Sequence, residues 1–99
     1  MEVKNFQNKI TEFVFAWDNK RNVTPNEQLT FSHVVEEVGE LAREYVNKEL
    51  RKERFSEEEL NNAIGDAVMQ LIELASLRNL DVENLILKII NEEQDDLKK

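Results

Sequence analysis

The sequence contains no cysteine, one histidine, one proline and two glycines. The absence of cysteine excludes disulfides, thiolate zinc ligands and cysteine nucleophiles, and one histidine is too few for a histidine-rich transition-metal site. Folds built from many short strands need frequent turn residues, which so little glycine and proline cannot supply. No apolar run approaches the roughly 18 residues of a membrane-spanning helix. These absences favour an all-α chain with no membrane partner.

The residues that are present are typical of one folded domain over residues 1–99, because 40% are hydrophobic and 34% are charged. The net charge of −8 makes the chain a poor general binder of nucleic acid. The excess of acidic over basic residues is concentrated in residues 55–99, which hold 11 acidic and 4 basic side chains. The first five residues lack the basic start and apolar stretch of a signal peptide, so we expect a cytoplasmic location.

Apolar residues recur three or four positions apart and predict four helices. Thr24 and Thr30 are two candidate starts for the second helix, and Ser56 and Asp81 are the predicted N-caps of the third and fourth. Gly39 interrupts the second helix, which suggests a close approach of another backbone. The acidic tail is expected to fray. The helices are predicted over residues 3–17, 24–46, 56–75 and 81–90.

The third predicted helix is apolar over well over half of its circumference at roughly 100° per residue. Such a helix is either the central helix of a monomer or the meeting point of two copies. A core of this size is marginal for a chain of 99 residues on its own. The pattern therefore favours a four-helix-bundle-like fold that is completed by homodimerisation.

Carboxylates form a strip along the second predicted helix. Glu37, Glu40 and Glu44 fall within roughly 60° of one another on a helical wheel, and His33 lies on the same strip. Unpaired glutamates three or four residues apart repel each other, and a hard cation such as Mg²⁺ turns that repulsion into binding. The spacing alone is equally compatible with an ordinary solvent-facing strip.

A second polar line runs down the third predicted helix. Asp66 lies at its centre, between apolar neighbours, so it occupies either a thin exposed strip or a buried site with a partner. The strip on the preceding helix favours a metal site shared between the two helices. The line consists of Glu59, Asn62, Asp66, Gln70 and Glu73.

Two motifs resemble those of the MazG-type all-α nucleotide pyrophosphohydrolases over roughly residues 28–80. Residues 36–42 read Glu-Glu-Val-Gly-Glu-Leu-Ala, and residues 64–66 read Ile-Gly-Asp. The family carries a Glu-x-x-Glu pair on one helix and a Glu-x-x-Asp pair on the next. Glu37 and Glu40 match the first pair and Asp66 matches the aspartate of the second. Ala63 stands where the family has its remaining glutamate.

The resemblance implies a helical bundle completed by dimerisation, sometimes stacked into tetramers, that uses Mg²⁺ to cleave nucleoside triphosphates into a monophosphate and pyrophosphate. Glu37, Glu40 and Asp66 are then the expected metal ligands. Glu36 is the candidate for orienting ligands or accepting the proton of the attacking water. Because Ala63 removes one carboxylate, we expect weak Mg²⁺ binding that substrate phosphates complete.

The other candidate site residues would contact the nucleotide. Lys48 and Arg51 could reach phosphates or be ordinary surface charges, and Trp17 could stack on a base or pack in the core. His33 could hydrogen-bond a base, and Asn62 or Glu59 could fill the gap at position 63.

Two alternative functions remain open. One is a phosphoribosyl-ATP pyrophosphatase-like enzyme, and the other is a non-catalytic dimer that binds nucleotide or protein, which Ala63 favours.

Overall fold

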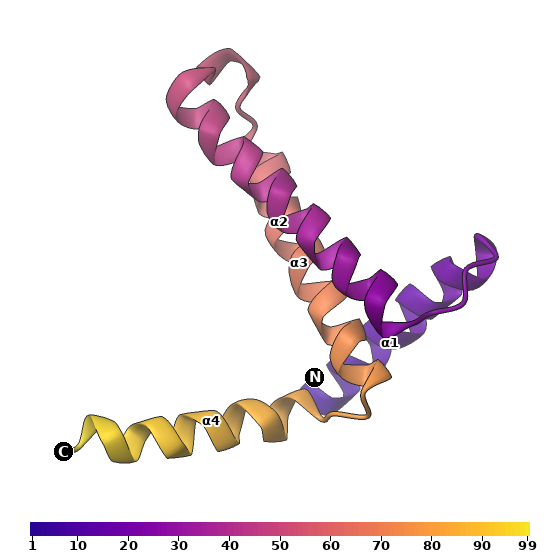
Figure 1. The fold of residues 1–99 in the computed structure, drawn as a ribbon, viewed down its shortest axis with the longest axis vertical. Helices are drawn as coiled ribbons and strands as arrows, with labels where there is room; N and C mark the ends of the chain where they lie inside the picture. Colours follow the sequence, from indigo (N-terminus) through magenta and orange to yellow (C-terminus); the bar gives the residue numbers. More distant parts are fainter.

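The computed structural model describes residues 1–99 and contains helices without any strand, which confirms the all-α prediction. Helices α2 and α3 run antiparallel and form a hairpin, α1 crosses the base of this hairpin, and α4 points away as a second arm (Figure 1). None of the helices combines the length and apolar character needed to cross a bilayer. The elements are α1 (Val3–Lys20), α2 (Glu27–Leu50), the short 3-10 helix η1 (Lys52–Arg54), α3 (Glu57–Leu77) and α4 (Val82–Leu97).

The N-caps of α3 and α4 are those predicted from the sequence. Ser56 Oγ accepts a hydrogen bond from the Glu59 amide at 3.1 Å, and Asp81 Oδ1 accepts one from the Asn84 amide at 3.1 Å. Both predicted starts of the second helix are wrong, because Asn26 is its N-cap and accepts from the Leu29 amide at 2.8 Å. The acidic tail that was expected to fray is helical to the end of α4.

The buried core is small and half polar. Six apolar side chains are buried, all on the faces where α1, α2 and α3 meet, together with six polar or charged ones. Gly39 does not mark a close backbone approach as predicted, since a Cβ placed there meets nothing within 4 Å. The buried apolar residues are Ile10, Val14, Val34, Leu60, Ala63 and Ala67, and the polar ones are Gln7, Asp18, Thr30, Glu44, Asn47 and Glu73.

Much of the apolar surface predicted to form a core is exposed in the single chain. No residue of α4 is buried. The chain exposes 7775 Å², whereas a compact monomer of this mass exposes about 5,900 Å². Its radius of gyration is 16.4 Å, against about 13 Å for a compact domain of this length. The single chain is therefore an open V and not a closed bundle (Figure 1).

Gln7 fixes the direction of α4. Its Nε2 donates to Ser76 Oγ at 3.1 Å and to the Leu80 carbonyl at 2.9 Å, and its Oε1 accepts from the Val82 amide at 2.9 Å. Asn79 adopts a left-handed conformation (φ 59°) just after α3 and ends that helix. The side chain of Gln7 thus ties α1 to both ends of the α3–α4 connection.

Candidate acidic site between the first three helices

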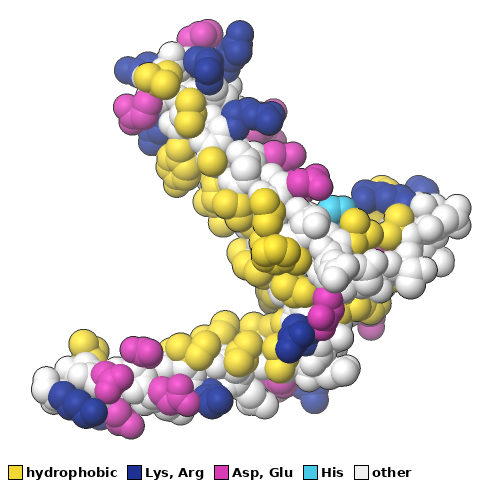
Figure 2. Space-filling model, in the orientation of Figure 1, with side chains coloured by type: hydrophobic (Ala, Val, Ile, Leu, Met, Phe, Trp, Pro, Cys, Tyr) yellow, Lys and Arg dark blue, Asp and Glu magenta, His cyan; other side chains and the backbone are white.

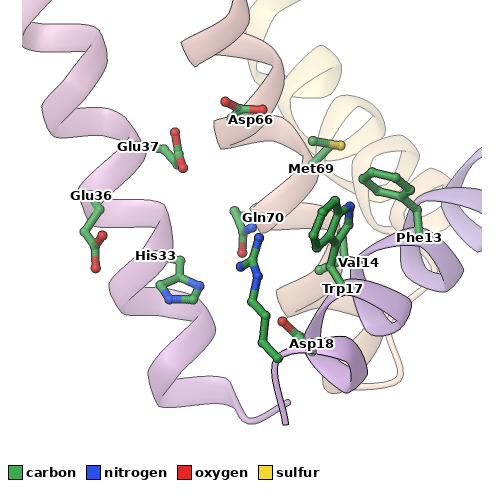
Figure 3. A pocket seen from close by; sticks show the side chains of 11 residues that line it. Phe13, Val14, Trp17, Asp18, His33, Glu36, Glu37, Asp66, Met69 and Gln70 are labelled. Atoms are coloured by element: carbon green, nitrogen blue, oxygen red, sulfur yellow. The ribbon is translucent and has the colours of Figure 1, made fainter. Parts of the chain in front are cut away.

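A cavity of about 340 Å³ lies where α1, α2 and α3 meet, and we call it the Trp17 cavity (Figure 3). Its volume falls at the lower end of the roughly 300–1,000 Å³ typical of small-molecule sites. Side chains of α1 form one wall, those of α2 form the opposite wall, and those of α3 lie between them. The lining residues are Phe13, Val14, Trp17, Asp18, Arg21, His33, Glu36, Glu37, Asp66, Met69 and Gln70.

A second cavity of about 300 Å³ lies further along the hairpin, and we call it the Ala63 cavity. Asp66 lines both cavities, so the two adjoin at this residue. Ala63 and Asp66 line the same cavity, as expected for positions three apart on one helix face. The lining residues are Glu40, Arg43, Glu44, Glu59, Asn62, Ala63 and Asp66.

The hairpin brings the two predicted acidic strips together. Glu44, which the sequence places on the strip of α2, accepts a hydrogen bond from the Ser56 amide at 3.1 Å through Oε1. This bond joins the last turns of α2 to Ser56, the N-cap of α3. Glu37 and Asp66, on the packed helices α2 and α3, face each other across the hairpin in Figure 3. Glu44 therefore acts as a structural residue.

Burial and neighbouring charges perturb Glu37. Desolvation raises the pKa of its carboxyl, and repulsion from Glu40, Asp66 and Glu36 raises that pKa further. The Oε2 atom of Glu37 and the Oε1 atom of Gln70 are both buried without a hydrogen-bond partner. Two unpaired oxygens on one cavity mark a place where a cation or an N–H donor would be stabilised.

The donor types fit a hard cation, whereas the arrangement is not a closed metal site. Glu37, Glu40 and Asp66 offer only carboxylate oxygens, which are the ligands that Mg²⁺ prefers. No group of three or more Asp, Glu or His side chains is close enough together to hold an ion. Coordination by all three would need side-chain rotation, for which the exposed side chain of Glu40 has space on its solvent side.

The cations nearest the acidic residues are not those predicted. Lys48 lies over the Phe55 ring at 5.7 Å, and Arg51 Nη1 donates to Asn47 Oδ1 at 3.5 Å, both at the far end of the hairpin. Neither lines the Trp17 cavity or the Ala63 cavity, which instead contain Arg21 and Arg43 respectively. Sequence reasoning missed Arg21, the residue that directly follows α1, although its position four residues after Trp17 was a usable signal.

Trp17 is 40% exposed and stands at the wall of its cavity, so it is not a core residue. Its ring packs edge-on against Phe13, with 6.5 Å between centroids. The Arg21 guanidinium carbon lies 4.9 Å from the Trp17 ring and Lys20 Nζ lies 5.2 Å from it. An aromatic face partly covered by cations is a surface on which a planar anionic ligand could stack.

A buried carboxyl pair lies beside the Trp17 cavity. Glu73 is 2% exposed, and burial together with the adjacent Asp18 raises its pKa to about 7, against a smaller lowering by Thr30. Glu73 Oε1 has no hydrogen-bond partner. Because Asp18, Thr30 and Glu73 come from α1, α2 and α3, the protonation of this pair affects the junction of all three helices.

Comparison with known proteins adds no relative. No protein-family model, no curated protein and no solved structure matches the chain.

Proposed function

We propose that the chain is a MazG-type, Mg²⁺-dependent nucleoside triphosphate pyrophosphohydrolase. The observation that carries the proposal is Glu37, a half-buried carboxylate with an unpaired oxygen that faces Asp66 and is repelled by the neighbouring charge of Glu40. Holding like charges together is unfavourable unless a cation compensates them. The match of Glu37 and Glu40 to the family's first motif, and of Asp66 to its second, supports the same reading.

Glu37, Glu40 and Asp66 would hold the ion, and Mg²⁺ would supply charge neutralisation for the phosphates when bound.

Trp17 would stack on the base in its cavity. His33 lines the wall opposite Trp17 and would hydrogen-bond the base. Arg21 lines the same cavity and is the nearest candidate for phosphate contact. Asn62 lines the Ala63 cavity and would contact the phosphate chain there.

The hydrolysis would begin with Glu36, or Glu37 beside it, accepting a proton from a water molecule. The water oxygen would form a bond to a phosphorus atom as the P–O bond between the α and β phosphates breaks. The products would be a nucleoside monophosphate and pyrophosphate. Ala63 leaves one carboxylate fewer than the family pattern, so the substrate's own phosphates would complete the ion's coordination.

The active form would be a homodimer. The excess of exposed surface over that of a compact monomer is about 1,900 Å² per chain. Obligate dimers bury roughly 2,000–5,000 Å² in total, so the excess is of the size that such an interface removes. A second copy of the chain would cover the apolar residues of α3.

A second candidate function is a non-catalytic dimer that binds nucleotide in the Trp17 cavity. Ala63 and the absence of a closed group of metal ligands favour this alternative. It predicts nucleotide binding with no release of pyrophosphate.

The test combines Mg²⁺-dependent thermal stability with pyrophosphate release from a panel of nucleoside triphosphates, with phosphoribosyl-ATP as an additional substrate. Mg²⁺ at ten times its dissociation constant should stabilise the wild type by about 1.4 kcal/mol. Glu40→Gln should abolish this stabilisation and the activity while retaining the fold. Glu49→Gln, a change of an exposed glutamate on the same helix, should alter neither.

The results separate the candidates. A rise in melting temperature with nucleoside triphosphate but no pyrophosphate release from any substrate would favour the binding function. A wild type that neither responds to Mg²⁺ nor releases pyrophosphate would overturn the hydrolase proposal.

A further inference from the structure

We propose that α4 is an exchanged arm, whose apolar stripe packs on the α2/α3 hairpin of a second copy of the chain. The acidic end of α4 would then lie over the basic tip of the partner's hairpin. The proposal rests on the self-association proposed above and is independent of the hydrolase activity.

Two apolar stripes lack partners within one chain. The stripe of α4 consists of Leu85, Ile86, Ile89 and Ile90, which are 38% to 49% exposed. The stripe of the hairpin consists of Val35, Val38, Ile64, Val68 and Leu71, which are 45% to 55% exposed. Both repeat every three or four residues, as in helices that pack against helices. Figure 2 shows hydrophobic side chains along the inner side of both arms of the V.

The apolar stripe of the hairpin lies away from the candidate site. Val35 and Val38 are rotated roughly 100° from the residues of α2 that face α3, in the direction opposite to His33 and Glu40. A second copy seated on this stripe would therefore leave the Trp17 cavity and the Ala63 cavity open.

The two stripes do not meet within the single chain. The connection between α3 and α4 is four residues long, from Arg78 to Asp81. The three hydrogen bonds of Gln7 hold this connection, and α4 packs chiefly against α1. The two arms therefore diverge (Figure 1), and each stripe is left for another molecule to cover.

Charge complementarity identifies that molecule as a second copy. The last turns of α4 carry Glu92, Glu93, Asp95 and Asp96, ahead of the terminal lysines. The tip of the hairpin carries Lys48, Arg51, Lys52 and Arg54 against Glu49 and Glu53, all of them exposed, so that residues 48–54 have a net charge of +2. If α4 lies along the partner's hairpin with its C-terminal end toward the tip, these opposite charges meet while the apolar stripes pack.

The lengths are also compatible. A helix of the length of α4 spans about 24 Å and one of the length of α3 spans about 31 Å. One arm thus covers most of one hairpin. An isolated helix as short as α4 is marginal in water without such packing.

The first experiment measures mass by light scattering on the full chain. The wild type should have twice the chain mass of 11.7 kDa. Ile86→Glu and Ile90→Glu should halve the observed mass, because they place charge in the buried stripe. Asn91→Glu, which adds the same charge on the opposite, exposed face of α4, should leave the dimer intact.

The second experiment identifies what α4 contacts. Because the chain has no cysteine, Ile90→Cys carries a single thiol that can be labelled with a photoreactive maleimide. Irradiation should join two chains covalently, with the cross-linked peptide drawn from residues 31–46 or 61–75 of the partner. This readout does not depend on whether the glutamate variants fold.

Each outcome decides a different claim. A wild type that scatters as a single chain overturns both the dimer and the exchanged arm. A dimer whose cross-links join α4 to α4, or only to its own chain, overturns the exchanged arm and leaves the dimer standing. Neither result bears on Mg²⁺ binding, which the Glu40→Gln experiment tests separately.

Discussion

Replacement of Glu73 by glutamine is expected to stabilise the fold above pH 7 and to remove most of its pH dependence between pH 5 and 8. The folded state holds Glu73 buried beside Asp18, and its pKa is raised to about 7 from an ordinary value of 4.5. The folded chain therefore binds a proton that the unfolded chain releases over this range. The contribution of protonated Glu73 to the free energy of unfolding is fully present below about pH 4.5. It is lost as the pH rises through 7.

The magnitude follows from the pKa difference. A rise from 4.5 to about 7 corresponds to roughly 3 kcal/mol of stability lost on ionisation of Glu73, at about 1.36 kcal/mol per pKa unit. Glutamine resembles the protonated glutamate in shape and carries an N–H donor for Asp18, but it cannot ionise. At pH 8 the variant should regain most of that loss, whereas at pH 5 the two proteins should differ little.

Urea denaturation followed by Trp17 fluorescence provides the assay, in buffer that contains EDTA, at pH 5, 6, 7 and 8. Glu49→Gln, at an exposed site on α2, should retain the pH dependence of the wild type. A small slope should remain in Glu73→Gln because the raised pKa of Glu37 acts in the same direction. A wild type whose stability does not fall between pH 5 and 8, or a Glu73→Gln profile parallel to it, would refute the reasoning.

Two further substitutions test positions where this chain departs from expectation. Ala63→Glu should add a fourth carboxylate to the proposed ligands Glu37, Glu40 and Asp66, strengthen the Mg²⁺-dependent rise in melting temperature and increase pyrophosphate release. Unfolding, or no change in either property, would show that the second motif is misaligned. Gly39→Ala should stabilise the protein by about 0.5–1 kcal/mol in urea denaturation, because the position is helical and open. A loss of stability there would instead indicate that another chain approaches Gly39 closely.

The helices could be predicted from the sequence because helix formation depends on residues only three or four positions apart. Ser56 and Asp81 act within one turn of their own helix, so their capping roles were visible locally. Local information also placed Glu37 and Asp66 on polar strips of their own helices, and the packing of α2 against α3 brings both to one cavity. The start of α2 was missed because three neighbouring polar residues competed for the cap, and Asn26 makes the bond.

Only the tertiary structure decided how the helices are arranged. The direction of α4 depends on Gln7, which contacts residues about 70 positions further along the chain and has no local pattern to mark it. The pairing of Glu73 with Asp18 and the position of Arg21 on the Trp17 ring likewise depend on where α1 crosses the hairpin. Apolar spacing in the sequence shows that one face of α4 must be covered. Whether the same chain or another one covers that face depends on the angle at the α3–α4 turn. Long-range hydrogen bonds determine that angle.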